Sequence, residues 1–570
     1  MKKIKTLLYV ALMSVMMLFS SCKDWLTLMP LNDVVLENFW TEKADVESVL
    51  LGTYAALESN DCIVRMSMWG EMRSDNIVAN TSAPNDIIQI TKDNILETNS
   101  YTSWRCFYDV INKANTVLHF APIVAEKDPN YTVAELNANI AEATALRVLS
   151  YWYLIRAYKD VPYVTRPSID DTEEFLVPAE KFDVILQYLI DDLESVKKYA
   201  VNKYVLDEAN TARFTRVGIE AILADLYLWQ GNWDKCIETV DNILERKMVE
   251  YKEILEDDPT GCTVELIKDR YPMITDVVSN ISGNAYNEIF GQGNSFETLF
   301  ELSFMPNSGS PNFSFVREYY SESESDLGNL EVETRVGSGF EQGTNAIFES
   351  KYDGRYYETI VDNSGQYSIA KYAMQSIQFK LNTGDIKDDV RNYRSQNAES
   401  TWIIYRLTDV MLMQAEAKTM KAMEMGTDLT GDTLAARNQL LEEAFFTVQS
   451  VNWRAKGRNV FTQPDSISIA PYRGNAKQME ELILKERRRE LLYEGKRWFD
   501  LVRMARRDGD TKRLSQMVLL KYTENVSAVR IKLADMDAIY FPISKDELKI
   551  NTLLKQNPAY EEDEFIEKAD

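Results

Sequence analysis

The chain has 570 residues, of which 89 are acidic and 63 are basic, and its formal net charge is −26 at pH 7. So acidic a surface repels phosphate backbones, which argues against nucleic acid as a partner. The length allows a large core without disulfide staples, and the five cysteines show no close spacing typical of a metal or redox motif. A disulfide remains possible, but the sequence indicates no pair.

The N-terminus reads as an export signal. Three lysines within the first five residues precede an apolar run from Leu7 to Phe19, and Ser20, Ser21 and Cys22 follow. We expect residues 1–21 to be a lipoprotein signal peptide, with cleavage before Cys22 and lipid on its thiol. Phe19 departs from the usual lipobox leucine, and the alternative is an ordinary secretory signal with an incidental thiol. Removal of three lysines and no acid changes the net charge from −26 to −29.

The N-terminal part, residues 22–250, is predicted to be helical. No glycine occurs between Gly70 and Gly218, and glycine is costly inside helices. Six residues recur at helical spacing before Pro162 and Pro167 break the pattern: Ala141, Ala145, Val148, Leu149, Trp152 and Ile155. No second apolar run is long enough to span a bilayer, so lipid would be the only anchor.

Three segments favour tetratricopeptide-like helix pairs. Residues 217–246 carry small residues at the helix contacts and Gly231 at the turn; 405–421 pairs with 434–454, and 477–507 has Gly495 between two amphipathic stretches. Ordinary helical hairpins are the alternative. We therefore predict a mostly α fold, in which the C-terminal part, residues 251–570, holds its helical hallmarks at 405–507. Both parts are expected to form one compact unit.

The middle of the chain, about 280–370, has a different composition. It contains ten of the 22 glycines and many aromatics, including Tyr286, Phe304, Tyr319 and Tyr320. Glycine-broken aromatic sequence predicts irregular loops and a few short strands laid over the helices. Loops with more rings than they can bury are also where a ligand platform would lie.

Two other features favour structural roles. The 486–503 segment alternates arginines with acids, so helical spacing pairs Glu486 with Arg489; we interpret the segment as an ion-pair network rather than an anion site. His119 is the only histidine and has no flanking ligand pattern, so we expect no metal and no cofactor. No motif of a hydrolase or phosphate-binding enzyme appears, although paired carboxylates cannot be judged from sequence.

Several segments, in order along the chain, resemble the SusD/RagB-like outer-membrane nutrient-binding lipoproteins. The resemblance rests on residues 21–26, 38–40, 52–54, 73–76, 145–163, 405–417, 486–503, 541–543 and 554–558. The 486–503 stretch is the most specific of these. What the resemblance implies is a helical scaffold with four tetratricopeptide-like units, overlaid by loops, on the outer leaflet of the outer membrane. It also implies a TonB-dependent transporter barrel (SusC-like) as partner and no catalytic residues.

The resemblance further implies a ligand site built from N-terminal loops and mid-chain aromatics. Sugars stack on aromatic rings and take hydrogen bonds from carboxylate, amide and guanidinium groups. Our candidates for glycan contact are Trp69, Arg73, Asp75, Asn76, Trp104, Tyr286, Phe304, Tyr319 and Tyr320. The alternative for Trp69 and the tyrosines is a place in the core.

The favoured function is capture of a neutral glycan and its delivery to a transporter. A peptide-binding relative, a hydrolase on the same scaffold and a structural lid without ligand affinity are the alternatives.

The anchor can be tested directly. We expect Cys22→Ala to release the protein from the membrane fraction or to stop its processing, because the acyl chains would have no thiol to occupy. Fractionation and mass determination of the mature N-terminus provide the measurement. A variant that is cut at the same place and stays membrane-bound would contradict a lipid anchor at Cys22.

Overall fold

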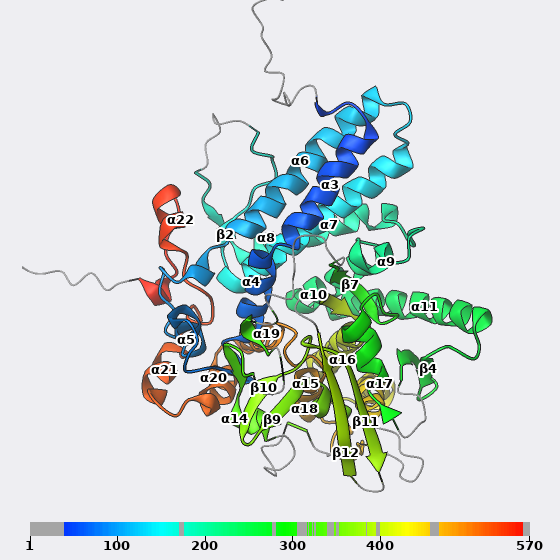
Figure 1. Ribbon diagram of the computed structural model, residues 1–570, viewed down its shortest axis with the longest axis vertical. Helices are drawn as coiled ribbons and strands as arrows, with labels where there is room; N and C mark the ends of the chain where they lie inside the picture. The colour runs from blue at the N-terminus through cyan, green and yellow to red at the C-terminus, as the bar shows by residue number, and fades with distance from the viewer. Residues whose placement is uncertain are drawn as a thin grey trace, which may run out of the picture.

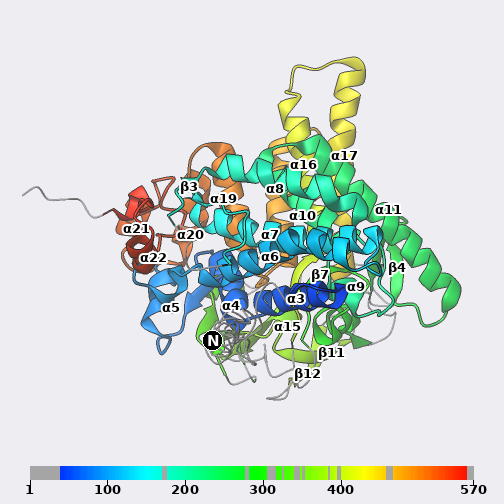
Figure 2. The ribbon, with the colours of Figure 1, turned by 90° about the horizontal axis from the view of Figure 1, so that it is seen from above.

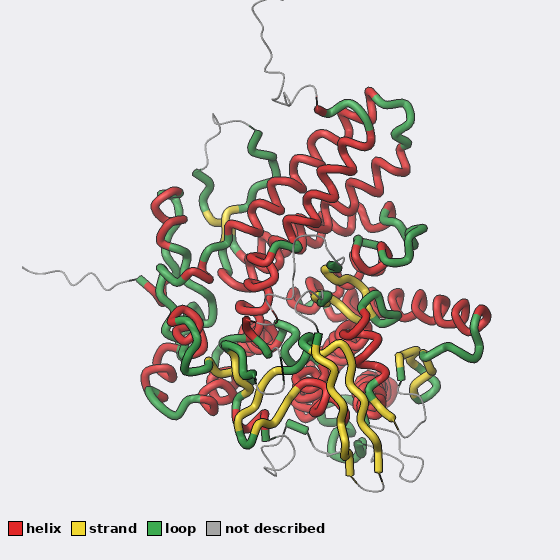
Figure 3. Tube along the Cα trace, in the orientation of Figure 1, coloured by secondary structure: helices red, strands yellow, loops and turns green. Residues whose placement is uncertain are grey.

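The computed structural model describes residues 39–561 apart from 170–175, 276–280, 305–315, 317, 322, 324–325, 339–346, 349–352, 383–384, 395–399 and 457–466; for 281–282 and 379–389 it describes the backbone alone. The expected signal peptide and Cys22 lie outside these residues. Among the helices that the structure describes, none combines the length and the apolar character needed to cross a membrane. Helices form most of the molecule and strands are short, as predicted (Figure 3).

The N-terminal part is a bundle of long helices (Figure 1). It contains α3 (Lys43–Leu57), α4 (Asn60–Glu71), α6 (Arg105–Lys127), α7 (Val133–Tyr158) and α8 (Phe182–Val196). Helix α7 begins with a capping box, in which Thr132 and Glu135 satisfy each other's backbone amides. From Ala141 onward α7 is buried on all sides, with α6 and α8 against it. This confirms the predicted helix and explains its apolar periodicity.

Each predicted helix pair is present. They are α10 (Arg216–Gln230) with α11 (Trp233–Asp257), α16 (Leu407–Glu424) with α17 (Gly431–Ala455), and α18 (Ala476–Glu490) with α19 (Arg497–Asp508). Gly231 ends α10 with a φ of 80°, a left-handed conformation that favours glycine. The pairs stack, because α11 packs on α16 and α16 on α18. Figure 2 shows α16 and α17 extending together from the body of the molecule.

Short strands and irregular turns fill the middle of the chain, as predicted. One sheet has the order β1-β8-β10-β9 and another the order β12-β11-β6, while β13 pairs with β7, β2 with β3 and β4 with β5, all antiparallel. The strands are β1 (Ile77–Ala79), β2 (Val161–Pro162), β3 (Ala179–Glu180), β4 (Val264–Ile267), β5 (Tyr271–Ile274), β6 (Ile281–Ser282), β7 (Thr298–Leu302), β8 (Leu330–Val332), β9 (Ile360–Asn363), β10 (Gln366–Ile369), β11 (Met374–Asn382), β12 (Asp385–Tyr393) and β13 (Trp402–Arg406).

Shorter helices complete the described chain. They are α5 (Asn85–Thr91), η2 (Ser100–Thr102), η3 (Lys197–Tyr199), α9 (Ala209–Ala212), α12 (Asn284–Tyr286), the π-helix η4 (Asn287–Gln292), α14 (Thr334–Gly337), α15 (Gly354–Thr359), α20 (Lys512–Val518), η6 (Leu519–Lys521), α21 (Val526–Lys532), α22 (Lys545–Ile550) and η7 (Pro558–Tyr560). One hydrophobic core runs from Trp40 to Leu554, and α11 continues through the division expected at residue 250. The boundary between an N-terminal and a C-terminal part at residue 250 stays a prediction.

Helix α4 lies very close to the turn between α18 and α19. A Cβ atom on Gly70 would stand 1.7 Å from the carbonyl oxygen of Gly495. Gly495 itself has a φ of 68°. Only glycine permits both the close approach and the left-handed turn, so these two residues fix how the N-terminal helices meet the C-terminal pairs.

The predicted ion-pair network is confirmed and is buried. Glu490 on α18 accepts from Arg406, Arg355 and Arg454 at 2.7, 2.8 and 2.6 Å. Glu494, in the turn after α18, pairs with Lys371 at 2.6 Å and with Arg406 at 2.8 Å. Burial alone would raise the pKa of Glu490, but the three guanidinium groups outweigh it and hold that pKa well below its usual range.

Trp498 on α19 provides a test of how α19 packs against the N-terminal part. Its ring is 1% exposed, its indole N–H donates to Ile539 at 3.2 Å, and the Arg73 guanidinium lies 4.3 Å from the ring centre. We expect Trp498→Ala to lower the free energy of unfolding by about 3–5 kcal/mol, because it leaves a cavity and an uncovered buried charge. Denaturant unfolding measures this. Trp233→Ala, at a half-buried ring, should cost clearly less, and equal losses would contradict the assignment.

Candidate functional site

The predicted contact residues are mostly interior. Trp69 is fully buried; its ring packs against Phe107 and Tyr158, and its indole N–H donates to the Tyr101 carbonyl at 3.0 Å. Trp104 is 3% exposed and meets the same Tyr158 ring edge-on. Protein covers both faces of the Trp69 ring, so we assign it a positioning role rather than a stacking role.

The polar candidates after Trp69 are held in internal pairs. Arg73 forms an ion pair with Asp93 at 2.7 Å and donates to three carbonyls of residues 538–540. Asp75 accepts from Arg497 at 2.9 Å and from Arg488 at 3.1 Å. Burial would raise the pKa of Asp75, but these guanidinium groups outweigh it and lower that pKa. These side chains therefore dock the end of α4 on α18 and α19.

Asn76 occupies the same interface. Its amide donates to Glu71 at 2.7 Å, and its carbonyl oxygen accepts from Arg488 at 2.7 Å. Among the mid-chain candidates, Tyr286 is 2% exposed and its hydroxyl donates to the Met374 carbonyl at 3.2 Å, while Phe304 is 8% exposed. The structure brings neither of these two into contact with the N-terminal candidates.

Tyr319 and Tyr320 do meet the N-terminal part. The Tyr319 hydroxyl lies 3.0 Å from the hydroxyl of Tyr101, a residue absent from our candidates. The Tyr320 hydroxyl donates to the Tyr493 carbonyl at 2.9 Å and lies 3.4 Å from Ser67. Tyr101 is partly exposed, whereas Tyr319 is 4% exposed and Tyr320 is fully buried. The ring of Tyr101 is thus the accessible part of this junction.

Buried side chains hold the peptide that carries Tyr101. Arg65 donates to the carbonyls of Ser100 and Ser103, the Trp69 indole to that of Tyr101, and the Tyr158 hydroxyl to that of Thr102 at 2.7 Å. Every carbonyl of residues 100–103 therefore has a donor. Such a segment gives up little conformational entropy when a ligand binds, so the ring of Tyr101 is preorganised.

Polar groups surround this ring. The Asp86 carboxylate accepts from the Ser100 amide and hydroxyl at 2.9 and 2.6 Å. Glu318 is exposed beside the tyrosine pair. Burial raises the pKa of Tyr101, and the negative charge of Glu318 adds to that rise. Carboxylates next to an aromatic ring suit ligand hydroxyl groups and disfavour an anionic ligand. We name Tyr101, Tyr319, Asp86, Ser100 and Glu318 the tyrosine platform.

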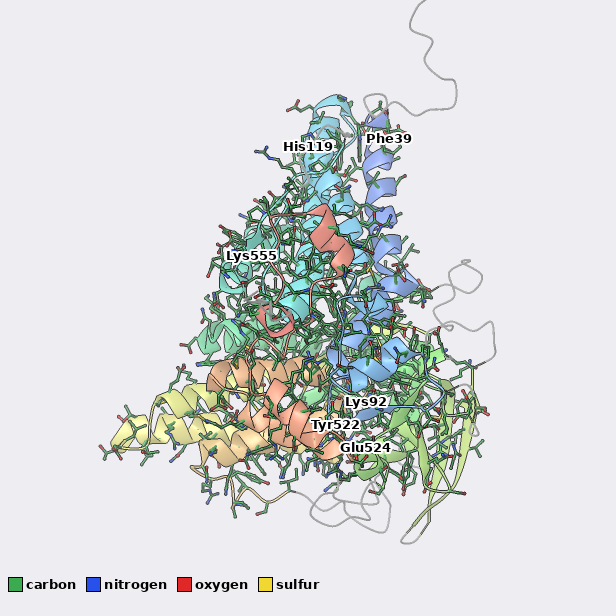
Figure 4. The ribbon with its side chains drawn as sticks, turned by 90° about the vertical axis from the view of Figure 1, so that its left-hand side faces the viewer. Phe39, Lys92, His119, Tyr522, Glu524 and Lys555 are labelled. Atoms are coloured by element: carbon green, nitrogen blue, oxygen red, sulfur yellow. The ribbon has the colours of Figure 1, made fainter. Side chains whose placement is uncertain are left out.

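No strong pattern in the sequence points to Tyr101. It lies three residues before Trp104, in a short Asn-Ser-Tyr-Thr-Ser stretch without periodicity. Its contacts come from residues that are far away in the chain, such as Tyr319, which local pattern cannot indicate. Among the described residues, no group of acids, cysteines or histidines could hold a metal ion, and His119 is exposed on α6 with its ring against Phe120 (Figure 4).

Comparison with known proteins shows which family the chain resembles. The SusD family model matches residues 307–560. SusD-like protein P38 of Formosa agariphila is 24% identical over 532 residues, covering 88% of this chain and 92% of that protein. The C-terminal part of the chain therefore matches the SusD family, and nearly the whole chain is similar to SusD-like proteins.

Solved structures of SusD-like proteins share the fold of this chain. A SusD superfamily protein from Bacteroides thetaiotaomicron superposes with a TM-score of 0.63 at 20% identity, covering 92% of this chain and 99% of the other. A laminarin-binding SusD-like protein gives a TM-score of 0.59 at 20% identity over 91% of this chain and 100% of its own. At these identities the likeness shows the fold.

Glu71 provides a pH test of how the site is held. Burial raises its pKa to about 7 despite the hydrogen bond from Asn76, and its Oε2 atom has no hydrogen-bond partner among the described residues. A raised carboxyl pKa contributes stability that is present below about pH 4.5 and lost as the pH rises through about 7. We expect Glu71→Gln to gain roughly 2 kcal/mol relative to the parent between pH 5 and pH 8, since the amide has no charge to bury.

Unfolding curves at both pH values measure this gain, and Glu481→Gln, at an exposed acid, is the control. A parallel pH profile for parent and Glu71→Gln would show that Glu71 stays charged in the folded protein.

Proposed function

We propose that this protein binds a neutral glycan at the cell surface through the tyrosine platform. The match of residues 307–560 to the SusD family model supports the class of function, and a SusD-like protein with the same fold is described as laminarin-binding. The observation that carries the proposal is the hydroxyl pair of Tyr101 and Tyr319, 3.0 Å apart. It joins an N-terminal segment to the mid-chain aromatics, which is where the family resemblance led us to expect a ligand.

The chemistry of the platform favours a sugar. The accessible ring of Tyr101 can stack on the C–H face of a pyranose, while Asp86, Ser100 and Glu318 can hydrogen-bond its hydroxyls. Two carboxylates and a chain charge of −26 disfavour an anionic polysaccharide. Sugar hydroxyls are well solvated before binding, so we expect affinity between about 1 μM and 1 mM with weak salt dependence.

The cellular setting is part of the proposal. The lipid on Cys22 would tether the protein to the outer leaflet of the outer membrane, facing outward. There it would hand glycan to a SusC-like TonB-dependent transporter barrel. The ligand leaves chemically unchanged, because binding rather than bond cleavage is the proposed role. Many copies on one surface would raise the local ligand concentration and make modest affinity sufficient.

The test is calorimetry on a panel of neutral glycans. We expect Tyr101→Ala to lower affinity at least about tenfold, and Tyr101→Phe to retain most of it because the ring remains. Tyr319→Phe breaks the hydroxyl pair and should weaken binding by a smaller factor, since Tyr101 loses one support. Recovered glycan should be intact, and steady release of reducing ends would indicate a hydrolase instead.

Tyr199→Ala is the matched control, because that ring is 44% exposed and lies outside the platform. A Tyr101→Ala variant that folds normally and binds every glycan like the parent would place the ligand elsewhere. Binding of peptides, with no binding of any glycan in the panel, would favour the peptide-binding alternative.

A further inference from the structure

One apolar hollow shares no lining residue with the tyrosine platform. It has a volume of about 660 Å³ and lies between the start of α6, the segment after β2, and α22. Figure 4 looks onto the side of the molecule where the chain continues from α22 to Lys555. The volume of the hollow falls within the range of small-molecule sites, which is about 300–1,000 Å³.

Apart from Arg105, Arg166 and Glu547, the walls of this cavity are mainly apolar. Aliphatic side chains and two rings line it: Ile111, Val164, Val177, Ile550, Leu554, Trp104 and Tyr108. Three of the polar wall residues donate hydrogen bonds to backbone carbonyls. Asn115 donates to the Val164 carbonyl at 3.1 Å, Asn551 to that of Val177 at 2.7 Å, and Tyr108 to that of Pro162 at 2.7 Å. A sugar would find few partners for its hydroxyls here.

Two guanidinium groups complete the lining. Arg105 and Arg166 both line the cavity and are exposed, and neither makes an ion pair with a residue that the structure describes. One acid, Glu547, faces the same space. Burial raises the pKa of Glu547, while a hydrogen bond from Trp104 and the charge of Arg105 oppose that rise. In a chain of net charge −26, two exposed arginines that make no ion pair with a described residue distinguish this cavity.

We propose that this cavity binds a small amphipathic anion, with its apolar body against Ile111, Val164 and Leu554 and its carboxylate at Arg105 and Arg166. Guanidinium groups bind carboxylates through paired hydrogen bonds, and removal of the apolar body from water supplies the remaining affinity. Glu547 opposes the ligand's charge and so limits that affinity. The site is independent of glycan binding at the tyrosine platform.

The probes are octanoate and 1-octanol, which share an apolar body and differ in charge. Calorimetry uses the mature chain with Cys22→Ala, so that no detergent is needed. We expect octanoate to bind at least about tenfold more tightly than octanol, and the double variant Arg105→Glu with Arg166→Glu to abolish that preference. Glu547→Gln should strengthen octanoate binding by about threefold and leave octanol unchanged.

Arg473→Glu, at an exposed arginine outside the cavity, is the matched charge control and should bind octanoate like the parent. Ile550→Glu, at a wall residue that is 67% exposed, should weaken binding without unfolding the protein. Equal affinity for both probes, an unchanged double variant, or no binding would overturn the proposal. A chain ending at Glu561 that binds octanoate when the full mature chain does not would also overturn it, since the acidic tail would then be the occupant.

Discussion

The turn between α18 and α19, residues 491–496, is the constraint on which the rest of the structure depends. Glu490, directly before this turn, and Glu494, within it, are buried carboxylates, and each is neutralised by cations from other segments. Arg406 comes from the end of β13, Arg454 from α17 and Lys371 from the loop after β10. Removal of one partner would leave an uncompensated buried charge, which typically costs about 3–5 kcal/mol. The helical pairs and the glycine-broken segment are therefore joined by electrostatics as well as by apolar packing.

Both halves of the tyrosine platform rest on this turn. On one side, α4 approaches Gly495 through Gly70 and carries Trp69, which holds the Tyr101 peptide. On the other side, Tyr320 donates to the carbonyl of Tyr493, whose φ of 63° is unusual for a non-glycine residue. Such a conformation persists only where surrounding contacts over-determine it. The position of Tyr319 against Tyr101 thus depends on the turn at Tyr493, which lies 173 residues after Tyr320 in the chain.

This dependence explains what could be predicted from sequence. Helix pairs and the 486–503 network leave local signals, because apolar periodicity, turn glycines and charges three or four residues apart are all short-range. A site built from contacts between distant segments leaves none. Trp69 illustrates the difficulty. A tryptophan beside Arg and Asp residues has the composition of a sugar site in either of two cases: its ring contacts the ligand, or it holds another segment that contacts the ligand. Tyr101 could be recognised only after Tyr319 was placed beside it.

A ligand surface made of irregular segments has to be rigid before it can be specific. Ordering one loop residue costs roughly 1–2 kcal/mol, which is comparable to what one stacked ring contributes. If the 100–103 segment were mobile, the cost of ordering it on binding would offset most of the free energy gained from the stacked ring. Here the ordering cost is met during folding, through Arg65, Trp69 and Tyr158. The burial of Trp69 is therefore compatible with an indirect effect on ligand affinity, because its indole holds the backbone carbonyl of Tyr101 without touching the ligand.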